Sequence, residues 1–183
     1  MLKSDLSQFD NSWYKPGSTL KIVYWYFVNL LFIKNRYFIF NGPKIWILRR
    51  FGGVIGRNCV IKPGVNIKYP WKLKIGNNVW IGEDVWIDNL DNVEIRDNVC
   101  ISQGAMLLCG NHNYKKSTFD LMIGKIFLGE GSWVGAKSIV CPGVTLQSHA
   151  VLSVGSFSST YLEPYSVYKG NPAVKVKNRI IEQ

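Results

Sequence analysis

The sequence predicts an all-β fold, a parallel β-helix of triangular cross-section with a helical and aromatic N-terminal segment and one protruding loop. The first observation is a six-residue rhythm of aliphatic residues, which runs from Ile55 to Leu107 and resumes from Leu128 to Leu152. The second is the irregular stretch 108–127 that interrupts this rhythm. A regular repeat is typical of a solenoid scaffold, and the loop that breaks it is where chemistry is expected.

Residues 1–51 are predicted to form the helical and aromatic segment. After the turn signal Pro16-Gly17, Ser18 or Thr19 can cap a helix, and nearly every residue from Leu20 to Ile33 is apolar. This stretch is shorter than the ~20 residues that a helix needs to cross a bilayer. No secretory leader is recognised at the start of the chain, so we expect a cytoplasmic protein.

Two roles stay open for this segment. The helix can cover an exposed coil of the repeat or form a subunit contact. Alternatively, residues 20–50 make a peripheral contact with an anionic membrane at the inner membrane face, because aromatic and basic side chains together suit the headgroup zone. The basic residues in question are Lys21, Lys34, Arg36, Arg49 and Arg50.

Residues 52–165 are predicted to be the β-helix, followed by a C-terminal tail, 166–183. Isoleucines 55, 61 and 67 are six apart and residue 75 follows after eight, so one coil takes twenty residues. Each coil then has three short strands with the aliphatic residue pointing inward, and Gly or Asn accepts positive φ at the corners. Strands of an ordinary sandwich would not keep a six-residue phase for so long.

Charge and cysteine content narrow the possible partners. Lys and Arg number 22 against 12 Asp and Glu, a formal charge of +10, which favours an anionic partner or simply solubility. The basic residues are scattered along the repeats, so nucleic acid is not expected, whereas a phosphorylated cofactor or a membrane surface fits. The four cysteines show no Cys-x-x-Cys spacing and are predicted to be reduced structural thiols.

The segments 75–82 (IGNNVWIG) and 133–144 (WVGAKSIVCPGV) resemble the hexapeptide-repeat acyltransferases, which form left-handed β-helices. Longer stretches resemble the sugar O-acetyltransferases, and among them the colanic acid biosynthesis acetyltransferases. These stretches are FDNSWY at 9–14, IKPGV at 61–65, KYPW at 68–71, WIDNL at 86–90 and CISQGA at 100–105. The resemblance covers essentially the whole chain. It also implies the left hand of the coil, which the general rule for parallel crossovers would not predict.

The resemblance implies direct acetyl transfer from acetyl-coenzyme A to a sugar hydroxyl of an exopolysaccharide, O-antigen or related glycan precursor, whether free, nucleotide-linked or lipid-linked. A base that is neutral near pH 7 suits this reaction, and histidine is the natural choice. Of the two histidines, His112 lies in the loop, at the position that matches the family's catalytic histidine, whereas His149 is expected at the surface.

The acceptor is expected to meet residues in and beside the loop. Asp88 and Asn89, on a corner one turn earlier, are predicted to hold the sugar or orient the imidazole, with a plain β-turn as the alternative. Asn111, Asn113, Tyr114 and Asp120 are predicted to line the acceptor pocket.

The resemblance also implies a homotrimer with acetyl-coenzyme A in the groove between subunits, along the C-terminal coils. The matching residues are Trp133, Gly135, Ala136, Val154, Gly155, Ser159, Lys175 and Lys177. Residues 152–160 (LSVGSFSST) depart from the family's usual sequence, so the adenosine end of the donor is expected to be held differently.

Three other functions are weighed against these residues. A zinc-dependent carbonic anhydrase on this scaffold needs three histidines and the chain has two, so no metal is expected. A xenobiotic, antibiotic or small-sugar O-acetyltransferase would share the histidine and the donor groove and differ in its acceptor pocket. A non-catalytic β-helix that serves as a binding platform is the alternative of a different class.

Overall fold

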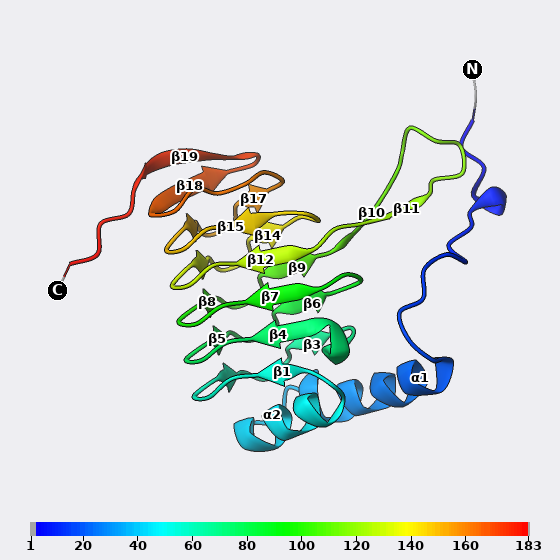
Figure 1. The fold of residues 1–183 in the computed structure, drawn as a ribbon, viewed down its shortest axis with the longest axis horizontal. Helices are drawn as coiled ribbons and strands as arrows, with labels where there is room; N and C mark the ends of the chain where they lie inside the picture. The colour runs from blue at the N-terminus through cyan, green and yellow to red at the C-terminus, as the bar shows by residue number, and fades with distance from the viewer. Residues whose placement is uncertain (1–2, 183) are drawn as a thin grey trace.

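The computed structural model describes residues 3–182 and shows a prism of stacked coils with two helices across one end (Figure 1). Three parallel sheets form the faces of the prism, and each coil contributes one strand to each face.

The first face contains β1 (Val54–Ile55), β4 (Leu73–Ile75), β7 (Val93–Ile95), β12 (Ile126–Leu128) and β15 (Thr145–Leu146). The second face contains β2 (Val60–Ile61), β5 (Trp80–Ile81), β8 (Cys100–Ile101), β13 (Trp133–Val134), β16 (Val151–Leu152), β18 (Ser166–Gly170) and β19 (Ala173–Asn178). The third face contains β3 (Asn66–Ile67), β6 (Trp86–Asp88), β9 (Met106–Leu108), β14 (Ile139–Val140) and β17 (Phe157–Ser158).

The register of the sheets confirms the predicted coil length. Ile55 pairs with Ile75, and Ile75 with Ile95, so equivalent residues are twenty apart before the insertion. After it, Leu128 pairs with Leu146, eighteen residues on, because the two extra corner residues are missing. One of the longer corners holds a short 3₁₀ helix, η3 (Pro70–Lys72).

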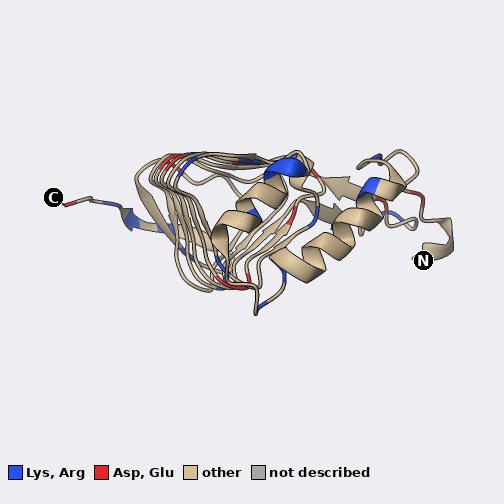
Figure 2. Cartoon of the chain, turned by 90° about the horizontal axis from the view of Figure 1, so that it is seen from below, with Lys and Arg blue, Asp and Glu red and all other residues tan. Residues whose placement is uncertain are grey.

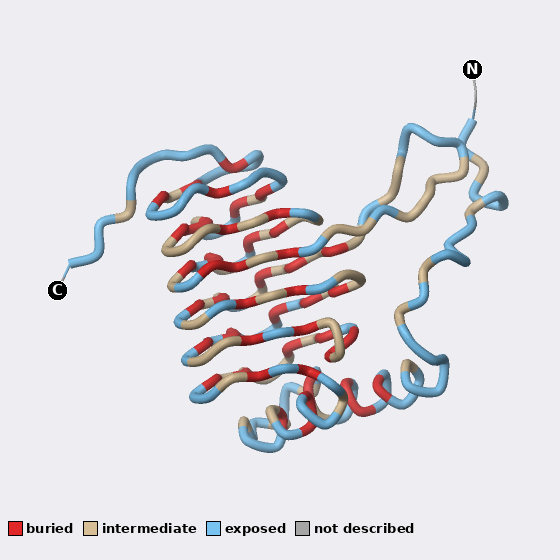
Figure 3. Tube along the Cα trace, in the orientation of Figure 1, coloured by how far each residue is buried: buried red, intermediate tan, exposed pale blue. Residues whose placement is uncertain are grey.

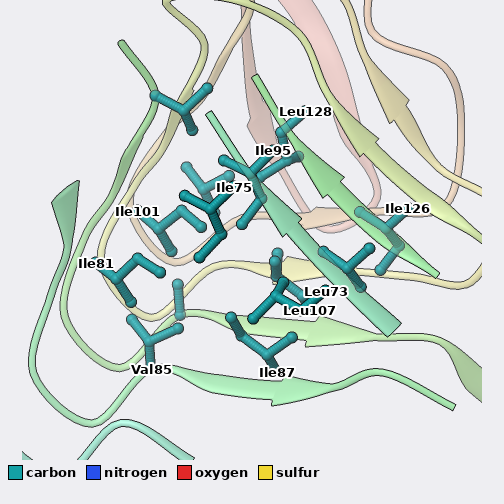
Figure 4. Packing of buried hydrophobic residues seen from close by; sticks show 14 of the residues in the cluster. Leu73, Ile75, Ile81, Val85, Ile87, Ile95, Ile101, Leu107, Ile126 and Leu128 are labelled. Carbon is teal, nitrogen blue, oxygen red and sulfur yellow. The ribbon is translucent and has the colours of Figure 1, made fainter. Parts of the chain in front are cut away.

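The inward residue of each hexad forms the core. Figure 4 shows these side chains stacked inside the prism, with Ile81 and Ile101 on the second face and Ile87 and Leu107 on the third. All four are fully buried, and buried segments, red in Figure 3, recur along successive coils. Burying such side chains contributes roughly 1.5–3 kcal/mol each, so the prism is stabilised by its repeat.

The corners depart from the prediction in one respect. Positive φ does occur there, at Asn58, Asn78 and Asp84 among others, but the glycines that directly follow the inward isoleucines serve another purpose. A Cβ on Gly56 would lie 2.3 Å from the carbonyl oxygen of Gly76, in the next coil. These glycines are therefore required for the close approach of successive corners.

Two helices and a π-helical turn close the first coil. They are α1 (Thr19–Val28), η2 (Asn29–Ile33) and α2 (Asn41–Arg50), and together with the connection 34–40 they are called the helical foot below. The Ser18 side chain accepts a hydrogen bond from the Lys21 N–H, which confirms the predicted cap. Asn41 begins α2. Its side chain donates to the Cys59 carbonyl and accepts from the Ile61 N–H, both at 2.8 Å, and so joins the foot to the first coil.

The two chain ends lie far from each other (Figure 1). The segment 166–178, predicted as part of a tail, forms the antiparallel pair β18–β19, and β18 continues the second face by pairing with β16. At the other end, an N-terminal arm, residues 3–17, includes the short 3₁₀ helix η1 (Leu6–Gln8) and runs beside the protruding loop.

Candidate active site

The interrupting stretch forms an antiparallel hairpin that leaves the corner between the third and first faces. Its strands are β10 (Gly110–His112) and β11 (Leu121–Ile123), and His112 pairs with Leu121. The Gly124 N–H donates to the Cys109 carbonyl at 2.9 Å and closes the stem. A Cβ on Gly110 would lie 2.4 Å from Leu90 Cδ1, so glycine is needed where the hairpin crosses the preceding corner.

His112 is half-buried and held by its own hairpin. Its Nδ1 lies 2.9 Å from the Phe119 carbonyl oxygen, and its ring stacks on the Phe119 ring at 4.5 Å and 8°. A carbonyl can only accept, so we assign the proton of the neutral imidazole to Nδ1, which leaves the lone pair on Nε2. Phe119 has φ +52, an uncommon conformation for a non-glycine residue, and strain of this kind clusters at functional sites.

The N-terminal arm contacts the same histidine. The Phe9 ring lies 5.6 Å from the His112 ring at 55°, and the Asp5 N–H donates to the Ser117 carbonyl at 2.8 Å. The Tyr14 hydroxyl donates to the Leu90 carbonyl at 2.6 Å and so fixes the arm at the base of the hairpin. Sequence reasoning missed Phe9 and Phe119 as functional candidates, although Phe9 begins one of the stretches that carried the resemblance.

Three of the predicted acceptor residues gather around a shallow hollow of ≈ 350 Å³ at the hairpin. Asn111, Asn113 and Tyr114 line it beside His112, and Tyr114 is 77% exposed. Asp120 does not line this hollow. Its two carboxylate oxygens accept hydrogen bonds within the hairpin, from Lys116 at 2.7 Å and from Thr118 at 2.6 Å. The hydrogen bond from Lys116 has the larger effect, and together with that from Thr118 it holds the pKa of the Asp120 carboxyl below its usual value.

Asp88 lies at the base of the hairpin, with its backbone paired to Leu108 and its carbonyl accepting from the Cys109 N–H. Its Oδ1 is 2.9 Å from Lys68 Nζ, an ion pair whose angles fall short of a hydrogen bond. The carboxylate also lines a hollow of ≈ 270 Å³ between α1 and the third face. The structure therefore brings Asp88 near the stem of the hairpin, outside the hollow beside His112.

Asn89 is fully buried and bonded to the main chain of the preceding coil. Its Oδ1 accepts from the Tyr69 N–H at 2.9 Å, and its Nδ2 donates to the Tyr69 carbonyl at 2.6 Å. These contacts tie two successive corners together and use both functional groups of the side-chain amide.

Replacing Asn89 by alanine is expected to lower the free energy of unfolding by about 2–4 kcal/mol, because two buried main-chain groups of Tyr69 lose their partners. Urea denaturation at one chain concentration measures the change. Asn92→Ala is the matched control, since Asn92 is exposed at the same corner and should change stability by less than about 0.5 kcal/mol. A raised KM for the acceptor with unchanged stability would instead assign Asn89 to substrate binding.

The predicted donor residues lie mainly on a different corner. Gly135 and Ala136 follow β13, and Val154 and Gly155 follow β16, so all four are at the corner between the second and third faces. Trp133 is 44% exposed and its indole N–H donates to the Ser102 hydroxyl at 2.9 Å. A Cβ on Gly155 would meet nothing within 4 Å. This corner is an open, partly apolar shelf along the stacked coils.

The remaining donor residues are dispersed. Ser159 is exposed and follows β17, whereas Lys175 and Lys177 lie on β19. Lys175 Nζ forms an ion pair with Glu163 at 2.7 Å. Within one chain, the hairpin with His112 and the shelf with Gly135 therefore occupy different corners of the prism, and the structure does not bring the two sets together.

The cysteines and His149 do not line the hollow beside His112. All four cysteines are free, and burial raises the pKa of the Cys109 thiol to about 12, so it stays protonated at neutral pH. His149 is half-buried at a corner with φ +60 and stacks on Tyr165 at 4.6 Å. Within residues 3–182, no cluster of three or more His, Cys, Asp or Glu side chains is placed to hold a metal ion.

Solved structures share this fold. The chain aligns with a maltose O-acetyltransferase from Clostridium difficile at TM-score 0.75 and 20% identity, covering 90% of both chains. It aligns with a hexapeptide-repeat acetyltransferase from Vibrio cholerae, determined with acetyl-coenzyme A, at TM-score 0.71 and 17% identity, covering 76% of this chain and 78% of that one. These likenesses define the class of the molecule: it has the left-handed β-helix of the hexapeptide-repeat acetyltransferases.

Sequence similarity identifies the family. The chain is 33% identical over 177 residues to the colanic acid biosynthesis acetyltransferase WcaF of Escherichia coli, covering 96% of this chain and 97% of the relative. It is also 26% identical to the galactoside O-acetyltransferase of Escherichia coli, over 69% of this chain and 64% of that protein. No family model matches the chain. The chain belongs to the family of acetyltransferases that includes WcaF.

Proposed function

We propose that the protein transfers an acetyl group from acetyl-coenzyme A to a sugar hydroxyl, with His112 as the general base. The observation that carries this proposal is the bond between His112 Nδ1 and the Phe119 carbonyl, which leaves Nε2 free to accept a proton. Nε2 takes the proton of the acceptor hydroxyl as its oxygen attacks the acetyl carbonyl, and gives this proton to the sulfur of the departing coenzyme A as the carbon–sulfur bond of the thioester breaks. No covalent intermediate on the protein is needed, since the acceptor oxygen attacks the thioester directly.

The shelf between the second and third faces fits the donor. Exposed Trp133 and Val154 offer apolar surface to a pantetheine arm, and the space beside Gly155 is free. Lys175 and Lys177, on β19 at the end of the second face, are suited to phosphate groups. Acetyl-coenzyme A supplies the acetyl group as an activated thioester. The Vibrio cholerae structure was determined with acetyl-coenzyme A, and the structure of a galactoside acetyltransferase with a similar fold was determined with coenzyme A.

The proposal includes a homotrimer, because His112 and the donor shelf lie at different corners of one prism. A neighbouring chain that sets its shelf against this hairpin would complete a site between subunits. Sedimentation velocity should then give three times the 20.8 kDa mass of the chain. A monomer that turns over substrate at full rate would contradict this arrangement.

The proposed acceptor is a bacterial glycan or its nucleotide-linked or lipid-linked precursor, in keeping with the name of WcaF. The hollow beside His112 is shallow and lined by Asn111, Asn113 and Tyr114, which suits hydroxyl groups on an extended sugar chain. The proposal places the reaction in the cytoplasm and includes a peripheral contact between residues 20–50 and an anionic membrane.

Release of free thiol from acetyl-coenzyme A, measured across a panel of defined polysaccharide repeat units, tests this function. Wild-type protein should release thiol only when an acceptor is present. Acceptance of chloramphenicol or a simple galactoside in preference to every glycan would favour an antibiotic or small-sugar acetyltransferase, to which shorter similarities exist. Neither turnover nor acetyl-coenzyme A binding by calorimetry would favour a binding platform.

Phe9→Ala is expected to lower kcat about two- to tenfold, because the Phe9 ring packs against the His112 imidazole and such pairs contribute about 0.5–1.5 kcal/mol. Phe9→Leu should restore part of the loss, since it keeps apolar contact. The KM for acetyl-coenzyme A should stay unchanged in both variants. A larger effect on the donor KM than on kcat would show that the arm acts elsewhere.

A further inference from the structure

The inner face of the helical foot packs against the first coil of the prism. Trp25 is 2% exposed and donates to the Ile67 carbonyl at 2.9 Å, while Ile33 and Leu48 are fully buried. Lys44 is also fully buried and donates to the Ile61 carbonyl at 3.3 Å. This inner face closes the first coil and replaces the neighbour that a repeat would otherwise need.

Many large apolar side chains of the foot are exposed. Tyr37 is 93% exposed, Leu20 is 84% exposed and Trp46 is 66% exposed. The other large apolar side chains exposed there are Val23, Tyr24, Tyr26, Phe27, Leu30, Leu31, Ile39 and Phe40. Single exposed apolar residues are ordinary, but so many on one short segment mark an interaction surface.

The segment that forms this surface carries basic residues and no acidic ones, although Asp84, between β5 and β6, lies beside it. No Asp or Glu occurs between Asp10 and Glu83, whereas 12 of the 22 Lys and Arg residues do. On the foot, Arg36 pairs with Asp84 at 2.8 Å and Arg49 donates to the Ile55 carbonyl. Figure 2 looks onto this end of the prism, where the helices carry blue segments and no red.

This charge argues against a second copy of the chain as the occupant. A symmetric contact would place the same basic surface against itself, with no carboxylate from residues 11–82 to pair with it. An anionic bilayer offers both partners that the surface lacks, an apolar layer for the aromatic side chains and a negative headgroup layer for the basic ones. In the described part of the chain, neither helix is both long enough and apolar enough to cross a membrane. The foot is therefore suited to lie in the plane of the interface.

A groove on the foot gives this contact a specific site. It has a volume of ≈ 780 Å³ between α1 and α2, and Tyr24, Phe32, Phe38 and Trp46 line it. Lys21 and Arg50 line the same groove, and Lys21 Nζ also lies 4.2 Å from the centre of the Trp71 ring.

We infer that the foot docks on an anionic bilayer and that this groove holds one phospholipid, with the phosphate on Lys21 and Arg50 and an acyl chain on the aromatic wall. The inference rests on the proposed peripheral contact and extends it to named lipid contacts. In a trimer whose threefold axis runs along the prism, three feet would face one plane, and their affinities would combine.

Flotation of the full chain with lipid vesicles tests the inference. Wild-type protein should float with vesicles of phosphatidylglycerol and phosphatidylcholine and stay in the dense fraction with phosphatidylcholine alone. The double variant Lys21→Glu with Arg50→Glu should reduce the vesicle-bound fraction at least ~10-fold, because each basic side chain near an anionic surface contributes to binding. Trp46→Ala should weaken binding more than Ile180→Ala, a residue 82% exposed near the C-terminus.

The matched control is Lys125→Glu with Lys169→Glu, which makes the same change in net charge at exposed positions away from the foot. Circular dichroism melts of all variants establish that they fold. Equal flotation of the two double variants would overturn the lipid site in the groove. Wild-type protein that stays unbound would overturn the membrane contact altogether. Foot variants that dissociate a wild-type oligomer would also overturn it, because they would show that the foot is a contact between chains. Flotation requires no turnover, so neither outcome depends on the acetyl transfer.

Discussion

His112→Ala is expected to lower kcat by at least ~10², equivalent to about 2.7 kcal/mol of barrier, while the Kd for acetyl-coenzyme A changes little. The hydroxyl of a sugar is almost wholly protonated at neutral pH, so its attack depends on a group that removes the proton as the bond forms. In the proposed site that group is Nε2 of His112, because Nδ1 is bonded to the Phe119 carbonyl. Steady-state thiol release and calorimetry with acetyl-coenzyme A measure the two quantities separately.

His149→Asn is the control for this result, since it replaces the only other histidine. His149 lies at the corner between the first and second faces, and asparagine tolerates its positive φ of +60. Its kcat should stay within about twofold of wild type. Retention of more than a tenth of kcat by His112→Ala, or an equal loss in both variants, would rule out His112 as the base.

The coil could be predicted from the sequence because its core residues stack along a single axis, coil upon coil. Each inward position packs on its equivalent in the next coil, so the requirement for an aliphatic residue recurs at a fixed interval, as Ile55, Ile75 and Ile95 show. The role of the glycines could not be predicted in the same way. The atom closest to a Cβ on Gly56 is the carbonyl oxygen of Gly76, twenty residues away, so only the structure shows that Gly56 is needed for close approach and not for a positive φ.

The sequence predicts the protruding loop and its histidine, but not the residues that hold the imidazole in place. His112 was picked out because it lies where the repeat fails, a feature that a single sequence shows. Its partners depend on the path of two irregular segments: the turn that brings Phe119 back to the ring, and the arm that brings Phe9 from more than a hundred residues away. Neither segment has a period, so neither contact leaves a pattern in the sequence.

Asn89 illustrates a further limit. An Asp-Asn pair at a corner is typical both of a turn and of a sugar contact, and the sequence does not separate them. The structure gives the two residues different surroundings, with Asn89 bonded to Tyr69 and Asp88 facing a hollow beneath α1. Burial, which decides between the roles, depends on where the preceding coil lies.

Gly135→Ala is expected to lower the free energy of unfolding by about 3 kcal/mol, the upper end of what overpacking usually costs. Its Cβ would lie 2.5 Å from the Val154 nitrogen and 2.8 Å from the Leu152 carbonyl oxygen, both main-chain atoms of the next coil. The Gly135 N–H also donates to that carbonyl at 2.7 Å, so any shift that relieves the clash strains the ladder. Urea denaturation at a fixed chain concentration measures the change.

Gly155→Ala is the matched substitution on the same corner, one coil further on. Its φ of +65 costs an alanine about 1–2 kcal/mol, but its Cβ would meet nothing within 4 Å. Gly155→Ala should therefore be the milder change for stability, and it should weaken acetyl-coenzyme A binding if the donor occupies that free space. A Gly135→Ala variant as stable as wild type would show that successive coils can separate at this corner. In that case Gly135 would be required for the donor and not for the stacking of the prism.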